Sequence, residues 1–339
     1  MSERYSRQEL FAGIQKEGQK KLSSKHVLII GAGALGTGNA EILARAGVGR
    51  ITIVDRDYVE WSNLQRQQLF SEKDAENRMP KAIAARERLL QINSDVQIES
   101  YIMDVGIQEI EELTEDVDLI LDATDNFDIR LLINDISQKR KIPWIYGACV
   151  GSYGLSYTII PGKTPCLGCL LESVPMGGAT CDTAGIIAPA VQMVVVHQTS
   201  EALKILVEDI KALRNTLVSF DLWNNHYVAM NVDKMKKADC PSCGEAPIYP
   251  YLQPENQMKT AVLCGRNTVQ IRPAERIERD LNQLAETLSR SGGKVEKNPY
   301  LVSFIQGDHR LVVFKDGRVL VHGTKDIAEA KSLYHRFIG

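Results

Sequence analysis

Four cysteines, arranged as two Cys-x-x-Cys pairs, are the residues of this 339-residue chain that point most directly to chemistry. The pairs are Cys166 with Cys169 and Cys240 with Cys243. Such pairs are typical of a zinc site with four cysteine ligands, and we favour that interpretation over free thiols. Because four thiolates fill every coordination position, the predicted zinc is structural rather than catalytic. The long gap between the pairs predicts that the site joins two distant segments.

A glycine-rich turn near the N-terminus predicts a nucleotide site. Gly31, Gly33 and Gly36 form G-x-G-x-x-G between an expected strand at Val27–Ile30 and an expected helix at Leu35–Ala46. The first glycine permits a tight turn, the second lets the backbone approach a phosphate, and the third lets helix and strand pack closely. The N–H groups at the start of the helix would point at that phosphate.

The residues after this turn favour a triphosphate over a nicotinamide. Asp55 ends the expected strand Ile51–Val54, where its carboxylate can accept the ribose hydroxyls. The same arrangement occurs in nicotinamide-dependent dehydrogenases, so the turn and Asp55 alone leave the cofactor open. The next loop carries Asp57, Asn63 and Arg66 beyond the carboxyl edge of the sheet. A triphosphate site needs such a cation, whereas a hydride-transfer site has no evident need for it.

A lysine and an acid are expected at the same edge. Lys81 opens the expected helix Lys81–Ile92, where its ammonium can reach a β- or γ-phosphate; the alternative is a solvent-facing lysine. Asp125 follows the expected strand Val117–Leu121 and can hold Mg²⁺. The alternative for Asp125 is to cap the expected helix Asp128–Lys139.

Three cysteines remain outside the two pairs. Cys149 lies in an apolar expected strand and is predicted to be a core residue. Cys181 lies among small residues just before a long helix, where a thiol can be exposed and its pKa lowered. A reactive and an inert Cys181 both fit this pattern, and the role of Cys264 is open.

The order of apolar runs predicts an α/β fold with a Rossmann-like mixed sheet, parallel in its N-terminal half and antiparallel in its C-terminal half. The later strands lack helical crossovers, which is why we expect them to be antiparallel. Beyond the strands named above, strands are expected at Val96–Asp104, Ile142–Cys149, Ser156–Ile160, Leu217–Leu222 and Tyr227–Val232, with a short helix at Ile107–Thr114.

Two domains are expected, at residues 1–245 and 246–339. The second begins with a predicted linker, Pro247–Asn256, and continues as a small α+β module. No constellation of polar residues is evident in this module, and a docking role is expected for it. Its expected elements are strands at Thr268–Arg272, Tyr300–Ile305 and Arg310–Val321, the last with a hairpin turn at Asp316-Gly317, and helices at Ala274–Ser289 and Ile327–Phe337.

Bulk properties favour a cytoplasmic protein with no nucleic-acid or membrane partner. The net charge is −3, whereas nucleic-acid binding requires a basic field. Met1–Gln19 is charged and unlike a signal peptide. Ile186–Val207 is interrupted by polar residues, which favours a buried helix over a membrane span. Met1–Leu22 is either a solvated arm or an arm that carries an arginine into a phosphate site, of its own subunit or of a neighbour.

Several short motifs of this chain together resemble the ThiF/MoeB/HesA family, the bacterial relatives of the ubiquitin-activating enzymes. They are G-A-G-A-L-G, D-R-D, S-N-L-Q-R-Q, M-P-K, T-D-N, T-C-D-T-A-G and the paired C-x-x-C. The resemblance covers about residues 1–245 and is to a Bacillus-type MoeB/ThiF protein with an extra C-terminal module.

The resemblance implies an ATP-dependent adenylyltransferase. Its substrate would be the C-terminal glycine carboxylate of a ubiquitin-like sulfur carrier, MoaD-like or ThiS-like. The carboxylate would attack the α-phosphorus of ATP and give an acyl-adenylate and pyrophosphate, for molybdopterin or thiamine biosynthesis. A homodimer is implied as well, and a cysteine desulfurase is a candidate partner. Two alternatives stay open: a nicotinamide-dependent oxidoreductase, and a non-catalytic scaffold that binds a ubiquitin-like tail.

The resemblance also assigns roles to matching residues. Arg66 and Lys81 would bind phosphates, Asp125 would hold Mg²⁺, and Arg7 would reach the phosphates of the partner subunit. Cys181 matches a cysteine that forms an acyl-persulfide with the carrier in ThiF-like members and is dispensable in MoeB-like members. The expected nucleotide-binding set is Gly31, Gly33, Gly36, Asp55, Asp57, Asn63, Arg66, Lys81 and Asp125.

Overall fold

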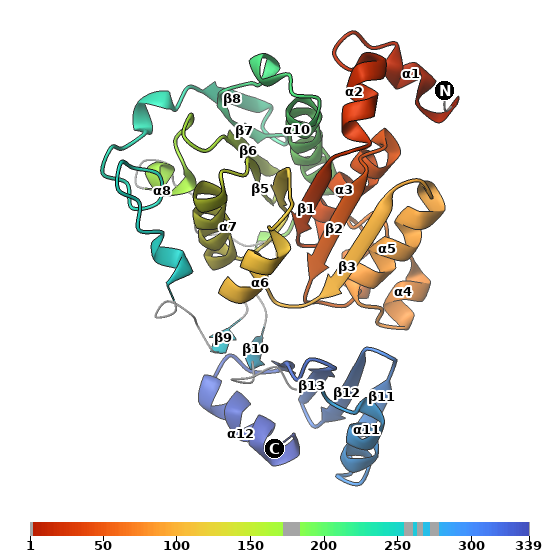
Figure 1. Ribbon diagram of the computed structural model, residues 1–339. Helices are drawn as coiled ribbons and strands as arrows, with labels where there is room; N and C mark the ends of the chain where they lie inside the picture. Colours follow the sequence, from red (N-terminus) through yellow and green to blue (C-terminus); the bar gives the residue numbers. More distant parts are fainter. Residues whose placement is uncertain (1–2, 172–183, 254–259, 263–266, 272–277, 339) are drawn as a thin grey trace. The chain divides into compact units, whose positions relative to one another are not determined.

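The computed structural model describes the chain except residues 1–2, 172–183, 254–259, 263–266, 272–277 and 339 (Figure 1). The chain folds into two compact units, Met1–Asn256 and Gln257–Gly339, which are described separately.

An eight-stranded mixed sheet forms the centre of the N-terminal unit (Figure 1). The first five strands of the spatial order are parallel, and the last three pair antiparallel. The predicted mixed sheet is therefore confirmed. The spatial order is β3 (Gln97–Ile102), β2 (Arg50–Asp55), β1 (His26–Ile30), β4 (Leu119–Asp122), β5 (Trp144–Val150), β6 (Tyr153–Ile159), β7 (Leu217–Asp221) and β8 (His226–Met230).

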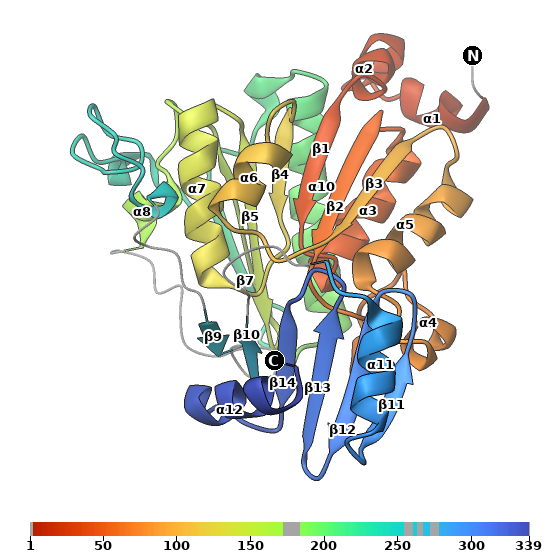
Figure 2. The same cartoon turned by 60° about the horizontal axis from the view of Figure 1, so that its bottom comes forward.

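Helices cover both faces of this sheet (Figure 2). Strand β1 is buried throughout, as a central parallel strand must be. Its Val27 and Ile29 pack with one helix layer, and its Leu28 and Ile30 pack with the other. The first layer contains α3 (Ala34–Ala46), α5 (Lys81–Ile92) and α10 (Ala188–Leu206); the second contains α6 (Ile107–Leu113) and α7 (Phe127–Arg140).

The apolar segment Ile186–Val207 is a buried helix, as predicted. Its helix α10 contacts β5 and β6, and Val191, Val194 and Val195 are fully buried. Within the described residues, no helix is long and apolar enough to cross a membrane.

The N-terminal segment is more ordered than a solvated arm. It forms short helices, and Leu22 is fully buried. The amide groups of Gln8 and Gln19 both donate to the carbonyl oxygen of Ala46, at the end of α3, over 2.9 and 3.0 Å. The segment is therefore anchored to the body of the unit. Its elements are η1 (Glu3–Tyr5), α1 (Ser6–Glu9) and α2 (Gln15–Leu22).

The predicted linker also differs from expectation, because part of it packs on the N-terminal unit. The 3₁₀ turn η5 (Pro250–Leu252) contacts α7, and Leu252 joins the core. The N–H of Tyr251 donates to the Asp135 carboxylate over 2.8 Å. The other short elements of the unit are η2 (Trp61–Asn63), α4 (Glu72–Glu76), α8 (Leu167–Leu170), η3 (Ile210–Ala212) and η4 (Asp233–Met235).

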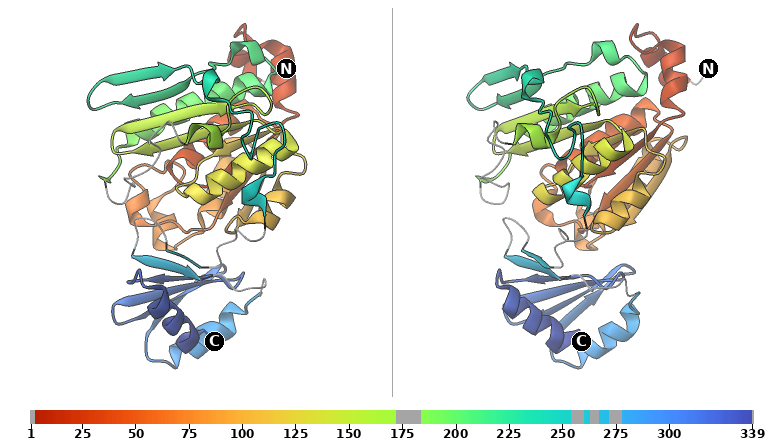
Figure 3. Two further views of the ribbon diagram at one scale, coloured as in Figure 1. Left: turned by 90° about the vertical axis from the view of Figure 1, so that its left-hand side faces the viewer. Right: turned by 60° about the vertical axis from the view of Figure 1, so that its left-hand side comes forward.

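The C-terminal unit is a six-stranded antiparallel sheet with two helices on one face (Figure 3). Leu284, Leu288 and Ala330 of the helices pack in one cluster with sheet residues. The helices are α11 (Leu281–Ser289) and α12 (Ile327–Phe337), and the strand order is β11 (Lys294–Lys297), β12 (Leu301–Gln306), β13 (His309–Phe314), β14 (Val319–His322), β10 (Thr268–Ile271) and β9 (Thr260–Val262).

Helix α11 begins later than predicted from the sequence. The carboxylate of Asp280 accepts the N–H groups of Asn282 and Gln283 and so caps a helix that starts at Leu281. The predicted hairpin turn at Asp316-Gly317 is confirmed, because it joins β13 and β14.

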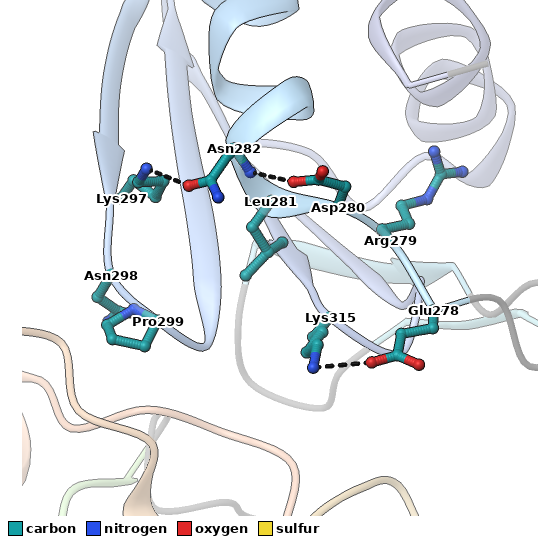
Figure 4. Close-up of a pocket in the computed structure, with 9 residues that line it drawn as sticks. All are labelled: Glu278, Arg279, Asp280, Leu281, Asn282, Lys297, Asn298, Pro299 and Lys315. Atoms are coloured by element: carbon teal, nitrogen blue, oxygen red, sulfur yellow. Dashed lines mark hydrogen bonds and ion pairs between the residues drawn. The ribbon is translucent and has the colours of Figure 1, made fainter.

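A polar pocket of about 690 Å³ lies in this unit, a constellation that the sequence did not reveal (Figure 4). Lys297 donates to the side-chain oxygen of Asn282 over 2.6 Å, and Lys315 pairs with Glu278 over 2.7 Å. These lysines therefore have partners within the unit. The lining residues are Glu278, Arg279, Asp280, Leu281, Asn282, Lys297, Asn298, Pro299 and Lys315.

Candidate active site

The glycine turn lies where β1 meets α3. Gly31 has φ +101°, and a Cβ at Gly31 or Gly36 would collide with backbone oxygens. These two glycines are thus required by the packing of the chain itself. A Cβ at Gly33 would meet only the Gln67 amide nitrogen, at 3.8 Å. Gly33 therefore leaves open space at the start of α3, as a site for an approaching phosphate needs.

Asp55 holds the turn against the end of β2. Its carboxylate accepts the N–H of Ala32 over 2.6 Å and the N–H of Asp57 over 2.7 Å. Burial raises the pKa of Asp55, and the ammonium of Lys81 opposes this rise. A carboxylate has about four acceptor positions, so the two backbone donors leave room for ribose hydroxyls.

Lys81 is the first residue of α5 and is only 4% exposed. The alternative of a solvent-facing lysine is therefore wrong. Its Nζ lies 3.7 Å from Oδ2 of Asp57, and its own N–H donates to the Asp57 carbonyl over 2.9 Å. The ammonium is thus held at the carboxyl edge of the sheet by an ion pair that is itself largely buried.

The loop after β2 carries Arg66, and Asn63 shapes that loop. Asn63 is buried, and its side-chain oxygen accepts the N–H of Glu60 over 2.9 Å. Its carbonyl oxygen accepts the N–H groups of Arg66 and Gln67. Arg66 is half-buried and donates to the Ser62 carbonyl over 2.8 Å. Asn63 thus organises the backbone from which Arg66 projects.

Gln67 received no separate role from the sequence. It is 4% exposed, and its Oε1 has no hydrogen-bond partner among the residues that the structure describes. Its amide nitrogen is the side-chain atom that faces Gly33. A buried acceptor without a partner is costly, so Gln67 is a candidate nucleotide contact. The sequence signal that could have identified Gln67 is its position in the S-N-L-Q-R-Q motif.

Asp125 lies in the loop between β4 and α7, and its side chain is exposed. It does not cap α7. That role belongs to Asn126, whose side-chain oxygen accepts the N–H groups of Asp128 and Ile129. The capping alternative for Asp125 is therefore wrong, and its carboxylate remains at the carboxyl edge of the sheet.

Two arginines at this edge were not identified from the sequence. Arg56 lies between Asp55 and Asp57, and its Nη1 is 3.3 Å from the carboxylate of Asp104. Burial opposes its charge, but Asp104, Asp57 and Asp125 raise the pKa of Arg56. The second arginine, Arg130, forms an ion pair with the buried Asp122. The edge thus holds Arg56 and Lys81 among several carboxylates, and the D-R-D motif was the signal for Arg56.

Arg7 lies at the other end of the unit, so the structure does not bring it to the other predicted residues. It belongs to α1, beside the beginnings of β1 and β2 (Figure 1). The neighbouring Tyr5 accepts a hydrogen bond from Asn93, at the end of α5. Asn93 also donates to the carbonyl oxygen of Ala44, near the end of α3, over 2.7 Å. Helix α3 has 13 residues, so its end lies about 20 Å from the glycine turn at its start. Arg7, Leu10 and Phe11 are exposed.

The four paired cysteines meet in space as predicted. Their Sγ atoms lie within 4.8 Å of one another, with 3.6 Å between Cys166 and Cys240 and 3.5 Å between Cys169 and Cys243. Zinc–sulfur bonds of about 2.3 Å in a tetrahedron place sulfurs about 3.8 Å apart, so this cluster fits a zinc ion.

Helix α7 supports both halves of this cluster. The buried side chain of Asn134 accepts the N–H of Leu167, between the first two cysteines, over 2.8 Å. The adjacent buried Asp135 accepts a hydrogen bond from Ser242, between the other two. Burial, the largest effect, raises the pKa of Asp135, and the hydrogen bond from Ser242 opposes this rise.

Of the three remaining cysteines, the structure describes Cys149. Cys149 is partly buried against the core at the end of β5. Cys181 and Cys264 lie outside the described residues, so the two alternatives for Cys181 stay predictions and the role of Cys264 stays open.

Comparisons with known proteins agree with this arrangement. The ThiF family model matches residues 5–242. The chain is 56% identical over 339 residues to a Bacillus subtilis protein named sulfur carrier protein ThiS adenylyltransferase, with both chains covered completely. It is 34% identical over 244 residues to the Escherichia coli molybdopterin-synthase adenylyltransferase, covering 71% of this chain and 96% of that one. The structure of E. coli MccB with ATP shares the fold, with TM-score 0.62, 23% identity, and 72% and 75% of the two chains covered.

Proposed function

This chain belongs to the ThiF family, as its motifs predicted, and from that premise we propose that it adenylates the C-terminal glycine carboxylate of a ThiS-type sulfur carrier. It is an adenylyltransferase, and ATP is its nucleotide substrate. The family match decides against both a nicotinamide-dependent oxidoreductase and a non-catalytic scaffold.

The full-length match to the Bacillus ThiS enzyme is the observation that carries the choice of carrier. That match includes the C-terminal unit, whereas the match to the E. coli molybdopterin enzyme covers 71% of this chain. A MoaD-type carrier remains the second candidate, because that enzyme is nevertheless covered over 96% of its own length.

The chemistry requires two anions to meet. A carboxylate oxygen forms a bond to the α-phosphorus of ATP, the bond from that phosphorus to the bridging oxygen breaks, and pyrophosphate leaves. Coulomb repulsion between a carboxylate and a triphosphate is large in a partly dry site. Lys81 and Arg66 supply positive charge, and loss of one such group typically costs on the order of 3 kcal/mol in the transition state.

The other proposed nucleotide contacts involve residues at the carboxyl edge of the sheet. In this proposal Asp55 accepts the ribose hydroxyls, and Gly31, Gly33 and Gly36 allow the phosphates to approach the backbone. Asp57 holds Lys81, and Asn63 holds the loop of Arg66. Asp125 binds Mg²⁺, which supplies further positive charge at the phosphates when bound.

Arg7 acts on the site of a second subunit in this proposal, which therefore requires a homodimer. Its distance from the glycine turn of its own chain supports that role, as do the exposed apolar side chains of Leu10 and Phe11 beside it. A cation from the partner would complete the phosphate site of each subunit.

The other predicted features are assigned as follows. The four paired cysteines hold a structural zinc ion, adenylation belongs to the N-terminal unit, Met1–Asn256, and the C-terminal unit, Gln257–Gly339, forms a docking module. Cys181 joins the carrier through an acyl-persulfide in this proposal: the outer sulfur of a persulfide on Cys181 bonds to the acyl carbon of the carrier adenylate, and AMP leaves. A cysteine desulfurase delivers the sulfur.

ATP–pyrophosphate exchange tests this proposal. The purified protein is assayed with a ThiS-type carrier, a MoaD-type carrier, and a variant of each that lacks its terminal glycine. We expect exchange with the intact ThiS-type carrier and none with either truncated carrier. Exchange with the MoaD-type carrier alone would reassign the carrier, and exchange without any carrier would refute the proposed substrate.

A further inference from the structure

Arg130, on the first turn of α7, is a largely buried cation that the roles assigned above do not use. Its Nε donates to Oδ2 of Asp122 over 2.9 Å. Its Nη2 donates to the carbonyl oxygens of Thr124 and Gly147 over 2.7 and 3.1 Å. Its guanidinium also stacks over the ring of Tyr146, 5.0 Å from the centroid. One side chain therefore ties the loop after β4 to the neighbouring strand β5.

That loop carries Asp125 and lies directly against the glycine turn. The N–H of Ala123 donates to the carbonyl oxygen of Ile30, the last residue of β1, over 3.0 Å. Asp122 closes the start of the loop, because its Oδ1 accepts the N–H of Thr124 over 3.0 Å. The backbone that leads into Asp125 is thus fixed relative to the turn by these contacts.

A second layer holds the same loop from α10 and α3. The amide nitrogen of Gln198 donates to the carbonyl oxygens of Asp122 and Ile145 over 2.8 and 3.2 Å. Its side-chain oxygen accepts from Asn39 over 2.8 Å. Gln198, Asn39 and Asp122 are all completely buried. Buried hydrogen bonds in a connected network fix orientation, since each broken contact leaves an unsatisfied polar group.

We propose that Arg130 is a positioning residue for adenylation, which acts by holding Asp125 at the phosphate side of the glycine turn and does not itself touch the substrate. The proposal rests on the proposed function, because it assumes that Asp125 binds Mg²⁺ with ATP. Arg130 neutralises Asp122 and pins the Thr124 carbonyl, one residue before Asp125. A misplacement of about 1 Å in such a group can cost about 100-fold in rate.

Calorimetric titration of ATP, with and without Mg²⁺ and without carrier, tests this role. The variants are Arg130→Met and Arg130→Lys. The control is Arg214→Met, which removes a half-buried arginine that also donates to backbone carbonyl oxygens, those of Thr216 and Ser156. We expect the gain from Mg²⁺, the factor by which it raises ATP affinity, to be at least tenfold smaller in Arg130→Met than in the wild type. The affinity of the variant for ATP without Mg²⁺ should match that of the wild type. Arg130→Lys should recover part of that gain, and Arg214→Met should keep all of it.

A double variant separates positioning from general destabilisation. Asp125→Asn should lose the same gain, and Arg130→Met added to it should cause little further loss, because Arg130 acts through Asp125. A full further loss in the double variant would overturn the proposal. So would a normal response to Mg²⁺ in folded Arg130→Met, or, if that variant does not fold, in Arg130→Lys.

Pyrophosphate exchange by the wild type keeps the two proposals distinguishable. If the wild type fails with both carriers, the proposed function fails. If the wild type exchanges and Asp125→Asn does not, while Arg130→Met responds normally to Mg²⁺, only the role of Arg130 is refuted.

Discussion

Removal of the proposed zinc ion should destabilise the N-terminal unit without abolishing its chemistry. The perturbation is Cys243→Ser, which deletes one of the four sulfurs that lie within 4.8 Å of one another. The cluster is remote in sequence from Asp125 and Lys81, and its neighbours are Asn134 and Asp135 of α7. We therefore expect a structural effect, and the size of that effect follows from the length of chain that the ion closes.

Cys166 and Cys240 lie 74 positions apart in the chain. A covalent cross-link that closes a loop of this length lowers the entropy of the unfolded chain by an amount worth about 4 kcal/mol at 25 °C. A bound ion acts in the same way, since the site exists only in the folded state. For a unit of this size, a loss of about 4 kcal/mol lowers the melting temperature by about 10 °C.

Three measurements check this expectation: zinc content by elemental analysis, melting temperature by calorimetry, and pyrophosphate exchange well below the melting temperature. Cys149→Ser serves as the control, because it removes a cysteine that is not part of the cluster. We expect Cys243→Ser to lose zinc and melt about 10 °C lower, yet to retain exchange at low temperature. Unchanged melting after loss of zinc would refute the structural role, and loss of exchange in folded protein would point to a catalytic one.

Three further outcomes are expected. Lys81→Met should reduce pyrophosphate exchange by about 100-fold or more and lower the free energy of unfolding, measured in urea, by about 3 kcal/mol. Adding Asp57→Asn to this variant should restore its stability but not its exchange activity. Restored exchange would refute the catalytic role of Lys81. Mixing inactive Arg7→Ala and Asp125→Asn dimers, with subunit exchange, should restore about a quarter of wild-type exchange if Arg7 acts in the partner's site; no restoration would place Arg7 elsewhere. Burial and a neighbouring arginine lower the pKa of His197, so that as the pH falls the unfolded state binds a proton at His197 before the folded state does, and stability should decrease below about pH 6.5. His197→Gln should make this decrease smaller in unfolding experiments at pH 8 and 5.5. An unchanged pH dependence of stability in His197→Gln would contradict this expectation.

Local patterns predicted the features that depend on local chemistry. The apolar period and the glycine turn specified β1, α3 and β2, and the absence of crossovers specified the antiparallel half of the sheet. The Cys-x-x-Cys spacing identified the cluster because ligand spacing is a local property of the chain. The support of that cluster was not predictable in the same way. In the sequence, Asn134 and Asp135 look like ordinary polar residues of a helix. Only the fold places the two Cys-x-x-Cys pairs beside them.

The same limit applied to the carboxyl edge of the sheet, where the sequence offered more acids than a single Mg²⁺ site needs. Partners distant in sequence remove several of them from consideration. Asp55 accepts two backbone N–H groups, and the other pairs are Asp57 with Lys81, Asp104 with Arg56, and Asp122 with Arg130. Arg56 and Asp104 are 48 positions apart, so no local pattern reveals their pairing.

Asp125 differs from these acids because its side chain is exposed and Asn126 has taken over the helix cap. A carboxylate that binds a metal together with a phosphate must keep oxygens accessible to both. The tertiary pairings therefore favour Asp125 over Asp122 as the proposed Mg²⁺ ligand, in agreement with the sequence prediction from its place after a buried strand.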